Sequence, residues 1–253
     1  MSSDKPKIGH EIVGTPVYGP VDSRRYGLTV GINLMPAGEK VCNFSCVYCQ
    51  LGMKRTPVDK AQFPDVPTVI QELKKVLQEP FVKNCKNLVI SGNGEPTLHP
   101  DFATFVQTVC PLRDQLAPHL KIVCFTNGSR LDNPEIKKAL AMLDECAVKF
   151  DPAMETANLP DLMTQSCIIK HSADLPNLVI QSCLFTGKIS NISQDHLENW
   201  IRNLILIKPK RIDIYTIARQ TAVAGLEPLY HFHLKNIASH LKKNLNLPVR
   251  VVD

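Results

Sequence analysis

Short apolar runs alternate with longer amphipathic stretches along most of the chain. Runs rich in Val and Ile predict buried strands, because strands covered on both faces are apolar throughout. Six such runs lie at 28–34, 87–91, 121–126, 147–150, 178–184 and 211–217. Apolar positions at helical spacing between them predict amphipathic helices. We expect these helices near 66–77, 102–109, 133–145, 194–204 and 226–244, and a further short strand at 248–252.

Six β-α units in series indicate an α/β protein with a parallel sheet and right-handed crossovers. An open doubly wound sheet and a barrel-like curl both fit this order. Six units are too few for a closed eight-unit barrel, but they fit a partial (β/α)6 TIM-like barrel of parallel strands. We expect a single domain over 1–253, with an irregular lead-in at 1–27, the barrel core at 28–217 and a C-terminal extension at 218–253. Ligands should meet the carboxyl ends of the strands.

Composition places the chain among ordinary globular proteins. It has 253 residues, of which 44% are hydrophobic and 21% are charged, and this excludes disordered and collagen-like classes. No apolar run approaches the ~20 residues of a membrane-spanning helix, and the polar amino end lacks a secretory signal. We therefore expect a cytoplasmic protein. The net charge of +5 permits an anionic partner without requiring one.

Nine cysteines without an export signal predict free thiols or metal ligands. Six are scattered singly and are expected to be small buried hydrophobes: Cys85, Cys110, Cys124, Cys146, Cys167 and Cys183. The other three, Cys42, Cys46 and Cys49, follow the first predicted strand with the spacing Cys-x3-Cys-x2-Cys.

Three thiolates within eight residues can converge on one metal centre. A structural zinc site needs four ligands, so it would require a distant histidine, because the chain has no second cysteine pair of this kind. An iron–sulfur cube usually has four thiolate ligands. Three leave one iron open to a small molecule. Both kinds of centre remain open on spacing alone.

This loop, with Tyr48 just before the last cysteine, resembles the signature of the radical S-adenosylmethionine (radical SAM) superfamily. The resemblance implies a [4Fe-4S] cluster on Cys42, Cys46 and Cys49, whose fourth iron chelates the amino and carboxylate groups of S-adenosyl-L-methionine (SAM). It also implies reductive cleavage of SAM to methionine and a 5′-deoxyadenosyl radical, which abstracts hydrogen from a substrate. The implied class is an oxidoreductase or transferase.

A second segment follows the second predicted strand. Gly92-Asn93-Gly94-Glu95-Pro96 resembles the Gly-Gly-Glu-Pro motif of the same superfamily, with Asn93 in place of its first glycine. The resemblance implies SAM contacts by Gly92, Asn93, Gly94 and Glu95. By the same resemblance, further SAM contacts fall on Tyr48, Asn127, Asp151 and Gln181.

Residues 18–25 and 31–33 are similar to the start of small proteins near the wyosine-tRNA synthases. Those synthases carry upstream cysteines for a second cluster, and this chain has none before Cys42. The likeness suggests tRNA modification, with phosphates held by Arg24, Arg25, Lys54, Arg55 and the run 208–211. A small metabolite is an equal candidate. No catalytic residue beyond the cluster is identified.

Two other functions remain open. One is activation of a glycyl-radical enzyme, whose activases share this size and cysteine spacing. The other is a non-catalytic iron–sulfur or zinc protein. The resemblance implies an electron donor such as flavodoxin or ferredoxin, and we expect neither a membrane nor DNA as a partner.

Overall fold

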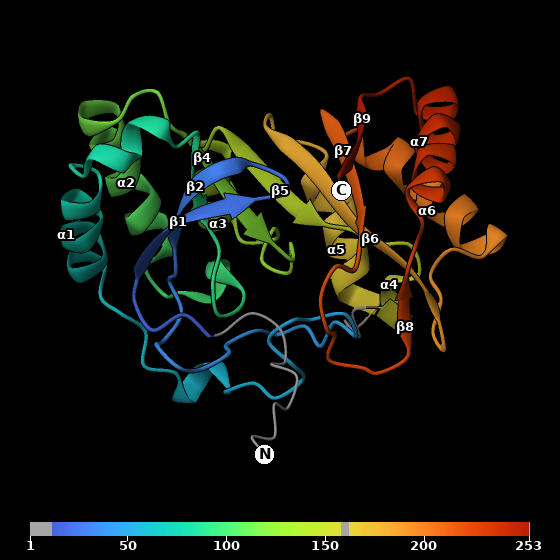
Figure 1. The fold of residues 1–253 in the computed structure, drawn as a ribbon, viewed down its shortest axis with the longest axis horizontal. Helices are drawn as coiled ribbons and strands as arrows, with labels where there is room; N and C mark the ends of the chain where they lie inside the picture. Colours follow the sequence, from blue (N-terminus) through green and yellow to red (C-terminus); the bar gives the residue numbers. More distant parts are fainter. Residues whose placement is uncertain (1–11, 158–161, 253) are drawn as a thin grey trace, which may run out of the picture.

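The computed structural model describes residues 12–157 and 162–252. A curved sheet forms its centre, with strands ordered β1-β2-β3-β4-β5-β6-β7-β9 (Figure 1). From β2 to β9 each neighbouring pair is parallel. The strands are β1 Val17–Ser23, β2 Gly27–Ile32, β3 Asn87–Ile90, β4 Lys121–Thr126, β5 Glu145–Lys149, β6 Leu178–Gly187, β7 Arg211–Thr216, β8 Leu226–Pro228 and β9 Val249–Val252.

The six predicted strands correspond to β2–β7, and helices lie between consecutive strands along the chain. In the described residues β1 and β9 do not pair with each other, so the curl stays open. The predicted partial barrel of parallel strands is therefore confirmed. The helices are α1 Val66–Val76, α2 Phe102–Leu116, α3 Pro134–Ala141, α4 Met154–Ala157, α5 Leu162–Ser172, α6 Gln194–Ile207 and α7 His231–Leu245, with short 3-10 turns at Val58–Lys60, Pro80–Asn84 and Pro96–Leu98.

Helices cover the convex side of the sheet (Figure 1). The predicted apolar face of α2, from Phe102 to Val109, is buried in the main core. Side-chain caps set the starts of α1 and α6: Asp65 accepts a hydrogen bond from Thr68 N, and Ser193 accepts one from His196 N. The concave side carries polar and aromatic side chains instead, and the site lies there.

The lead-in predicted to be irregular contains a strand. Val17–Ser23 forms β1, which pairs antiparallel with β2 and carries an irregular register between Tyr18 and Val21. Pro20 falls within this strand, and proline is tolerated on an edge because its missing N–H costs no ladder hydrogen bond there. Residues 1–11 of the predicted lead-in lie outside the described part of the chain.

The last helix begins later than predicted. Leu226–Pro228 forms β8, which pairs antiparallel with β6, and α7 starts only at His231. Pro228 explains the delay, because the residue before a proline favours extended backbone. The predicted short strand at the carboxyl end is confirmed as β9, which extends the parallel sheet beyond β7.

All nine cysteines are free thiols. Cys85, Cys124, Cys146 and Cys183 are buried as predicted, whereas Cys110 and Cys167 are only partly buried. None of the helices in the described ranges is long and apolar enough to span a bilayer.

Candidate functional site at the carboxyl ends of the strands

The three-cysteine loop is fixed against the turn that follows β3. Val41, directly before Cys42, forms an isolated parallel bridge with Gly94. Val41 N donates to Asn93 O at 2.9 Å, and Glu95 N donates to Val41 O at 2.9 Å. The two segments singled out from the sequence are therefore hydrogen-bonded edge to edge.

The three thiols share one partly buried environment. Cys42 Sγ accepts from Phe44 N at 3.4 Å, and Cys49 Sγ accepts from Lys40 Nζ at 3.1 Å. Burial raises the pKa of Cys42 to about 11. Burial also raises the pKa of Cys46, and the neighbouring Cys42 and Cys49 raise it further. The three thiols thus influence one another electrostatically.

In the described residues no group of three His, Cys, Asp or Glu side chains is placed to hold a single metal ion.

Two residues of the glycine-rich turn serve packing. A Cβ on Gly92 would lie 2.3 Å from Asn33 Oδ1, so a larger residue does not fit. Asn93 is fully buried, and its Nδ2 donates to Val13 O and Pro36 O at 2.8 and 2.9 Å. Because both amide protons are used by the backbone, the Asn93 side chain has no donor left for SAM.

Glu95 joins the turn after β3 to the end of β4. Its Oε1 accepts from Thr97 Oγ1 and Thr126 Oγ1, both at 2.6 Å, and its Oε2 accepts from Asn127 N at 2.6 Å. Burial raises the pKa of this carboxyl group, and its hydrogen bonds oppose the rise. Its observed contacts are thus within the protein and position Asn127.

Asn127 reaches the cysteine loop. Its Nδ2 donates to Asn43 Oδ1 at 2.8 Å and lies 3.9 Å from Cys42 Sγ. Its Oδ1 accepts from Ser129 N at 2.9 Å, which fixes the amide orientation. The fold therefore brings Asn127, Glu95 and Gly94 together with the cysteines.

Asp151 lies after β5 and is fully buried in a polar cluster. It accepts from Tyr48 Oη, from Lys149 Nζ at 3.0 Å and from Cys183 N at 2.6 Å. Lys149 also donates to Tyr215 Oη at 2.8 Å and lies over the Tyr48 ring, 4.6 Å from its centroid. Burial would lower the pKa of Lys149, but Asp151, Tyr215 and Cys183 together outweigh this effect and raise it. These contacts fix Tyr48, which directly precedes Cys49.

Gln181 belongs to a different layer, towards the amino ends of the strands. It accepts from Arg25 Nη1 at 2.5 Å, and its Nε2 donates to Tyr26 Oη at 3.3 Å. Both partners lie in the turn between β1 and β2, and the contact of Gln181 with SAM stays a prediction.

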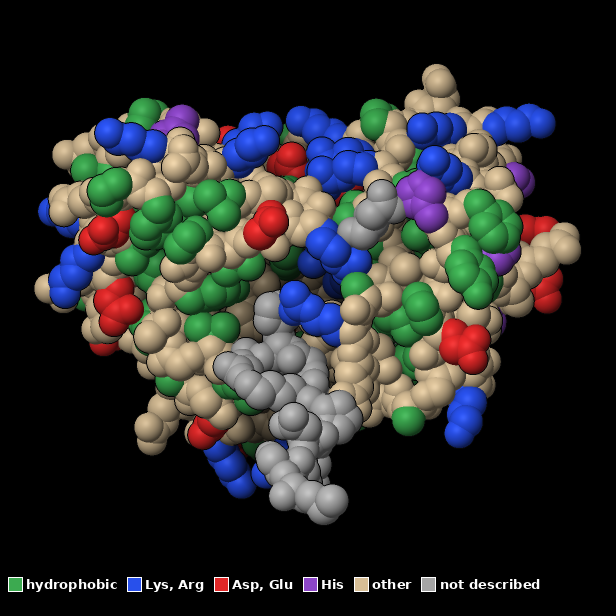
Figure 2. Space-filling model, in the orientation of Figure 1, with side chains coloured by type: hydrophobic (Ala, Val, Ile, Leu, Met, Phe, Trp, Pro, Cys, Tyr) green, Lys and Arg blue, Asp and Glu red, His purple; other side chains and the backbone are tan. Residues whose placement is uncertain are grey.

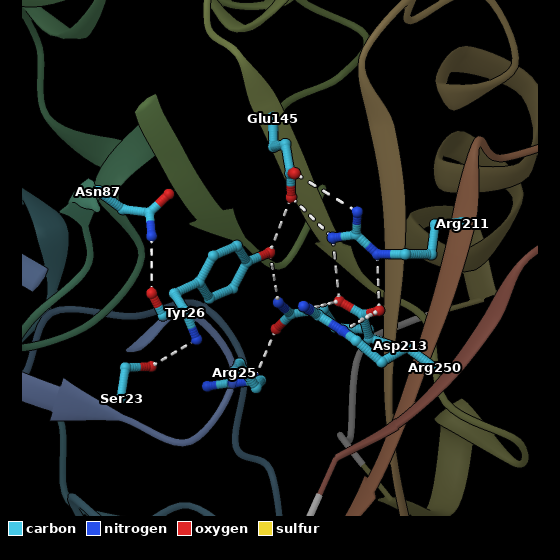
Figure 3. A network of polar contacts seen from close by, with 9 residues as sticks. Ser23, Arg25, Tyr26, Asn87, Glu145, Arg211, Asp213 and Arg250 are labelled. Atoms are coloured by element: carbon cyan, nitrogen blue, oxygen red, sulfur yellow. Dashed lines mark hydrogen bonds and ion pairs between the residues drawn. The ribbon is translucent and has the colours of Figure 1, made fainter. Parts of the chain in front are cut away.

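Below Gln181 a network of ion pairs joins β5, β7 and β9. Arg211 donates to Glu145 and Asp213, and Arg250 donates to the same fully buried Asp213 (Figure 3). The Arg211 guanidinium is thus already paired with two carboxylates, and phosphate binding by the run 208–211 stays a prediction. The network ties the concave face together at the amino ends of these strands.

A family model described as the radical SAM superfamily matches residues 40–158. That span contains the cysteine loop, the turn after β3, Asn127 and Asp151. The chain belongs to the radical SAM superfamily.

Curated proteins with other names also match the chain. A protein named GTPase Obg from Brachyspira hyodysenteriae is 28% identical over 93% of this chain and 35% of its own length. A UPF0026 protein from Helicobacter pylori is 35% identical over 53% of this chain and 41% of its own length. The chain thus spans less than half the length of both relatives.

Among solved structures, TYW1 with a lysine-pyruvate adduct bound superimposes with a TM-score of 0.61. The match is 13% identical and covers 85% of this chain and 73% of that one. At this identity the likeness concerns the fold alone.

The family implies a [4Fe-4S] cluster and SAM, and the donor set of this radical SAM protein fits such a cluster. Lys40 is buried, and its ammonium donates only to Cys49 Sγ and to Gly52 O among the described residues. A buried cation without a carboxylate partner is costly. It is accounted for if Cys49 is a thiolate in an anionic cluster.

Replacing Lys40 with methionine should make cluster reduction harder, because hydrogen bonds and charges at the sulfurs set the potential. We expect the midpoint potential to fall by at least about 60 mV, a tenfold change for one electron. An electron paramagnetic resonance redox titration measures it. Lys40→Arg should stay near wild type, and so should Lys54→Met. An unchanged potential in Lys40→Met would contradict a role for this contact.

A cavity of about 400 Å³ opens on the concave face beside the loop. It is bordered by Tyr48 and Cys49, by the rings of Phe125 and Tyr215, and by the guanidinium groups of Arg24, Arg25 and Arg219. A second cavity of about 760 Å³ lies between the 217–228 loop and Gly52 and shares Ile217 and Arg219 with the first. The site thus offers two adjoining spaces next to the cysteines.

Sequence reasoning missed Lys40 and Lys149. Each had a signal. Lys40 lies two residues before a thiol cluster, and Lys149 is a charge at the end of an otherwise apolar strand. The structure also places Tyr215 and Arg219 at the cavity.

Proposed function

We propose that this protein is a radical SAM enzyme whose cluster is held by Cys42, Cys46 and Cys49. When bound and reduced, such a cluster would supply the electron for cleavage of SAM to methionine and a 5′-deoxyadenosyl radical, which would abstract hydrogen from a substrate. One observation carries the proposal: the three-thiol loop is hydrogen-bonded to the turn after β3 at the mouth of an open parallel barrel.

The chain's own residues prepare this centre. The bridge between Val41 and Gly94 holds the cysteine loop against the turn after β3, and Lys40 compensates thiolate charge at Cys49. The Tyr48–Asp151 contact fixes the side of the loop that faces the cavity. We propose that SAM meets the backbone at Gly92 and Gly94 and the side chains of Asn127 and Tyr48.

For three predicted SAM residues we propose a revised role. Glu95 accepts from Asn127 N, Asp151 from Tyr48 Oη and Gln181 from Arg25 Nη1, so each holds a neighbouring residue in place. In this proposal they act as positioning residues.

The substrate space favours a small molecule over folded RNA. A cavity of about 400 Å³ lies in the usual size range of small-molecule sites. RNA would have to insert a single flipped nucleotide. We propose a reduced flavodoxin or ferredoxin as electron donor and a cytoplasmic setting, which suits nine free thiols.

Anaerobic reconstitution tests the proposal. We expect a brown protein with about four irons per chain, as a thiolate-held cube requires, and 5′-deoxyadenosine after addition of dithionite and SAM. Iron analysis and chromatography of the products measure both. A colourless protein holding one zinc, or a brown protein that leaves SAM intact, would overturn the assignment.

A further inference from the structure

The cavity beside the cysteine loop carries an excess of positive charge. Figure 2 shows Lys and Arg side chains gathered around the hollow in the middle of the concave face. Arg24 and Arg25 reach it from the turn between β1 and β2, and Arg219 reaches it from the loop after β7. Asp22 is the acidic residue that also borders it. Three guanidiniums against one carboxylate leave two positive charges.

These arginines lack acidic partners. Arg24 and Arg219 are exposed, and neither forms an ion pair or hydrogen bond within the described ranges. Elsewhere on the concave face the arginines are paired, as Arg211 is with Glu145 and Asp213. A cationic cavity without internal neutralisation is typical of a site for an anionic ligand.

Arg25 is held in place before any ligand arrives. Its guanidinium lies 4.6 Å from the centroid of the Phe125 ring and 4.7 Å from that of the Tyr215 ring. One N–H donates to Gln181 Oε1 at 2.5 Å, which leaves other N–H groups of the fork for a ligand. A preorganised guanidinium binds phosphate at a lower entropic cost than a mobile one.

The arginines also act on the cavity interior. Burial raises the pKa of Cys183 to about 12, and Lys149, Arg25 and Arg24 each oppose this rise. Cys183 lies on β6, where its N–H donates to Asp151, and it borders the same cavity as Tyr48 and Cys49. The positive field of the arginines therefore extends to the side of the cavity formed by the cysteine loop. An anion bound by these arginines would place the rest of its molecule near Tyr48 and Cys49.

We propose that Arg24, Arg25 and Arg219 form the binding site for a phosphate monoester on a small-molecule substrate. The excess of two charges matches a phosphate dianion, and guanidinium forks match its oxygens. The assignment rests on the proposed function, because it treats the cavity next to Cys49 as the substrate space.

The test is calorimetric binding to the anaerobically reconstituted protein in the presence of SAM. The probes are ribose 5-phosphate and neutral ribose. We expect ribose 5-phosphate to bind at least about tenfold more tightly than ribose. The double variant Arg24→Ala/Arg219→Ala should lose at least about tenfold in affinity for the phosphate. Both side chains are exposed, so the change should leave the fold and the iron content intact.

A matched control removes two exposed cations elsewhere. Lys74→Ala/Lys138→Ala lowers the net charge equally, and we expect its affinity for ribose 5-phosphate to equal that of wild type. Equal binding of ribose and ribose 5-phosphate, or equal losses in both double variants, would overturn the proposal. So would tRNA binding that ribose 5-phosphate cannot displace.

The binding test is independent of radical chemistry. Binding needs no reductant, and 5′-deoxyadenosine formation is measured on the same wild-type sample. Phosphate selectivity without SAM cleavage would contradict the proposed function but not the anion site. SAM cleavage without phosphate selectivity would contradict the anion site but not the proposed function.

Discussion

Replacement of Cys46 with alanine is expected to abolish cluster assembly and SAM cleavage. Cys46 lies between the other two cysteines in the sequence, and both of them raise the pKa of its thiol. A cube already short of one protein thiolate would have only two left, and it should not survive purification. We expect iron to fall to background, the brown colour to be lost and 5′-deoxyadenosine to fall below detection.

A cysteine outside the loop provides the control for this change. Cys110 is partly buried on α2, away from the loop, so Cys110→Ala should keep iron content and cleavage at wild-type values. Iron and 5′-deoxyadenosine at wild-type levels in Cys46→Ala would contradict the assigned ligand set. Loss of both in Cys110→Ala would show that the assay reports general instability.

Gly94→Ala is expected to displace the cysteine loop without touching a cysteine. An added Cβ would lie 1.7 Å from Val41 O and 2.5 Å from Val41 C, so the backbone before Cys42 must move. The residue also has a φ of +152°, which side chains rarely adopt. Clash and strain together should cost about 2–4 kcal/mol in the free energy of unfolding. The reconstituted protein should hold less than half the iron of wild type.

Gly38→Ala separates strain from clash. Gly38 also has a positive φ, +76°, but nothing lies within 4 Å of its added Cβ. We expect a loss of about 1 kcal/mol from strain and normal iron content. Denaturant unfolding and iron analysis measure both variants. Normal iron in Gly94→Ala, or equal iron loss in both, would show that the Val41–Gly94 contact does not set the loop.

Much of the fold could be predicted from local pattern. The six parallel strands follow from apolar runs, because a strand buried on both faces shows no polar alternation. The edge strand β1 and the short strand β8 were missed, because glycine and proline in Val17–Ser23 and Leu226–Pro228 mimic irregular backbone. Only pairing with β2 and β6 makes them strands.

For the site, the local sequence predicted which residues belong to it, but it did not predict which groups their side chains contact. Glu95, Asp151 and Gln181 were assigned to SAM by resemblance. The structure shows each bound to groups far away in sequence, such as Asn127 N, Tyr48 Oη and Arg25 Nη1. A polar side chain in a motif does not reveal which partner the fold supplies.

The sequence by itself determined the parallel α/β order, the three clustered thiols and the glycine that lets Val41 approach closely, because each depends on residues near one another in the chain. Only the tertiary structure decided which cations are available. Arg211 is neutralised by Glu145 from another strand, whereas in the described residues Arg24, Arg25 and Arg219 form no ion pair, although Asp22 borders the same cavity. Coulomb pairing acts over a few ångströms in space, and folding alone sets which charges come that close.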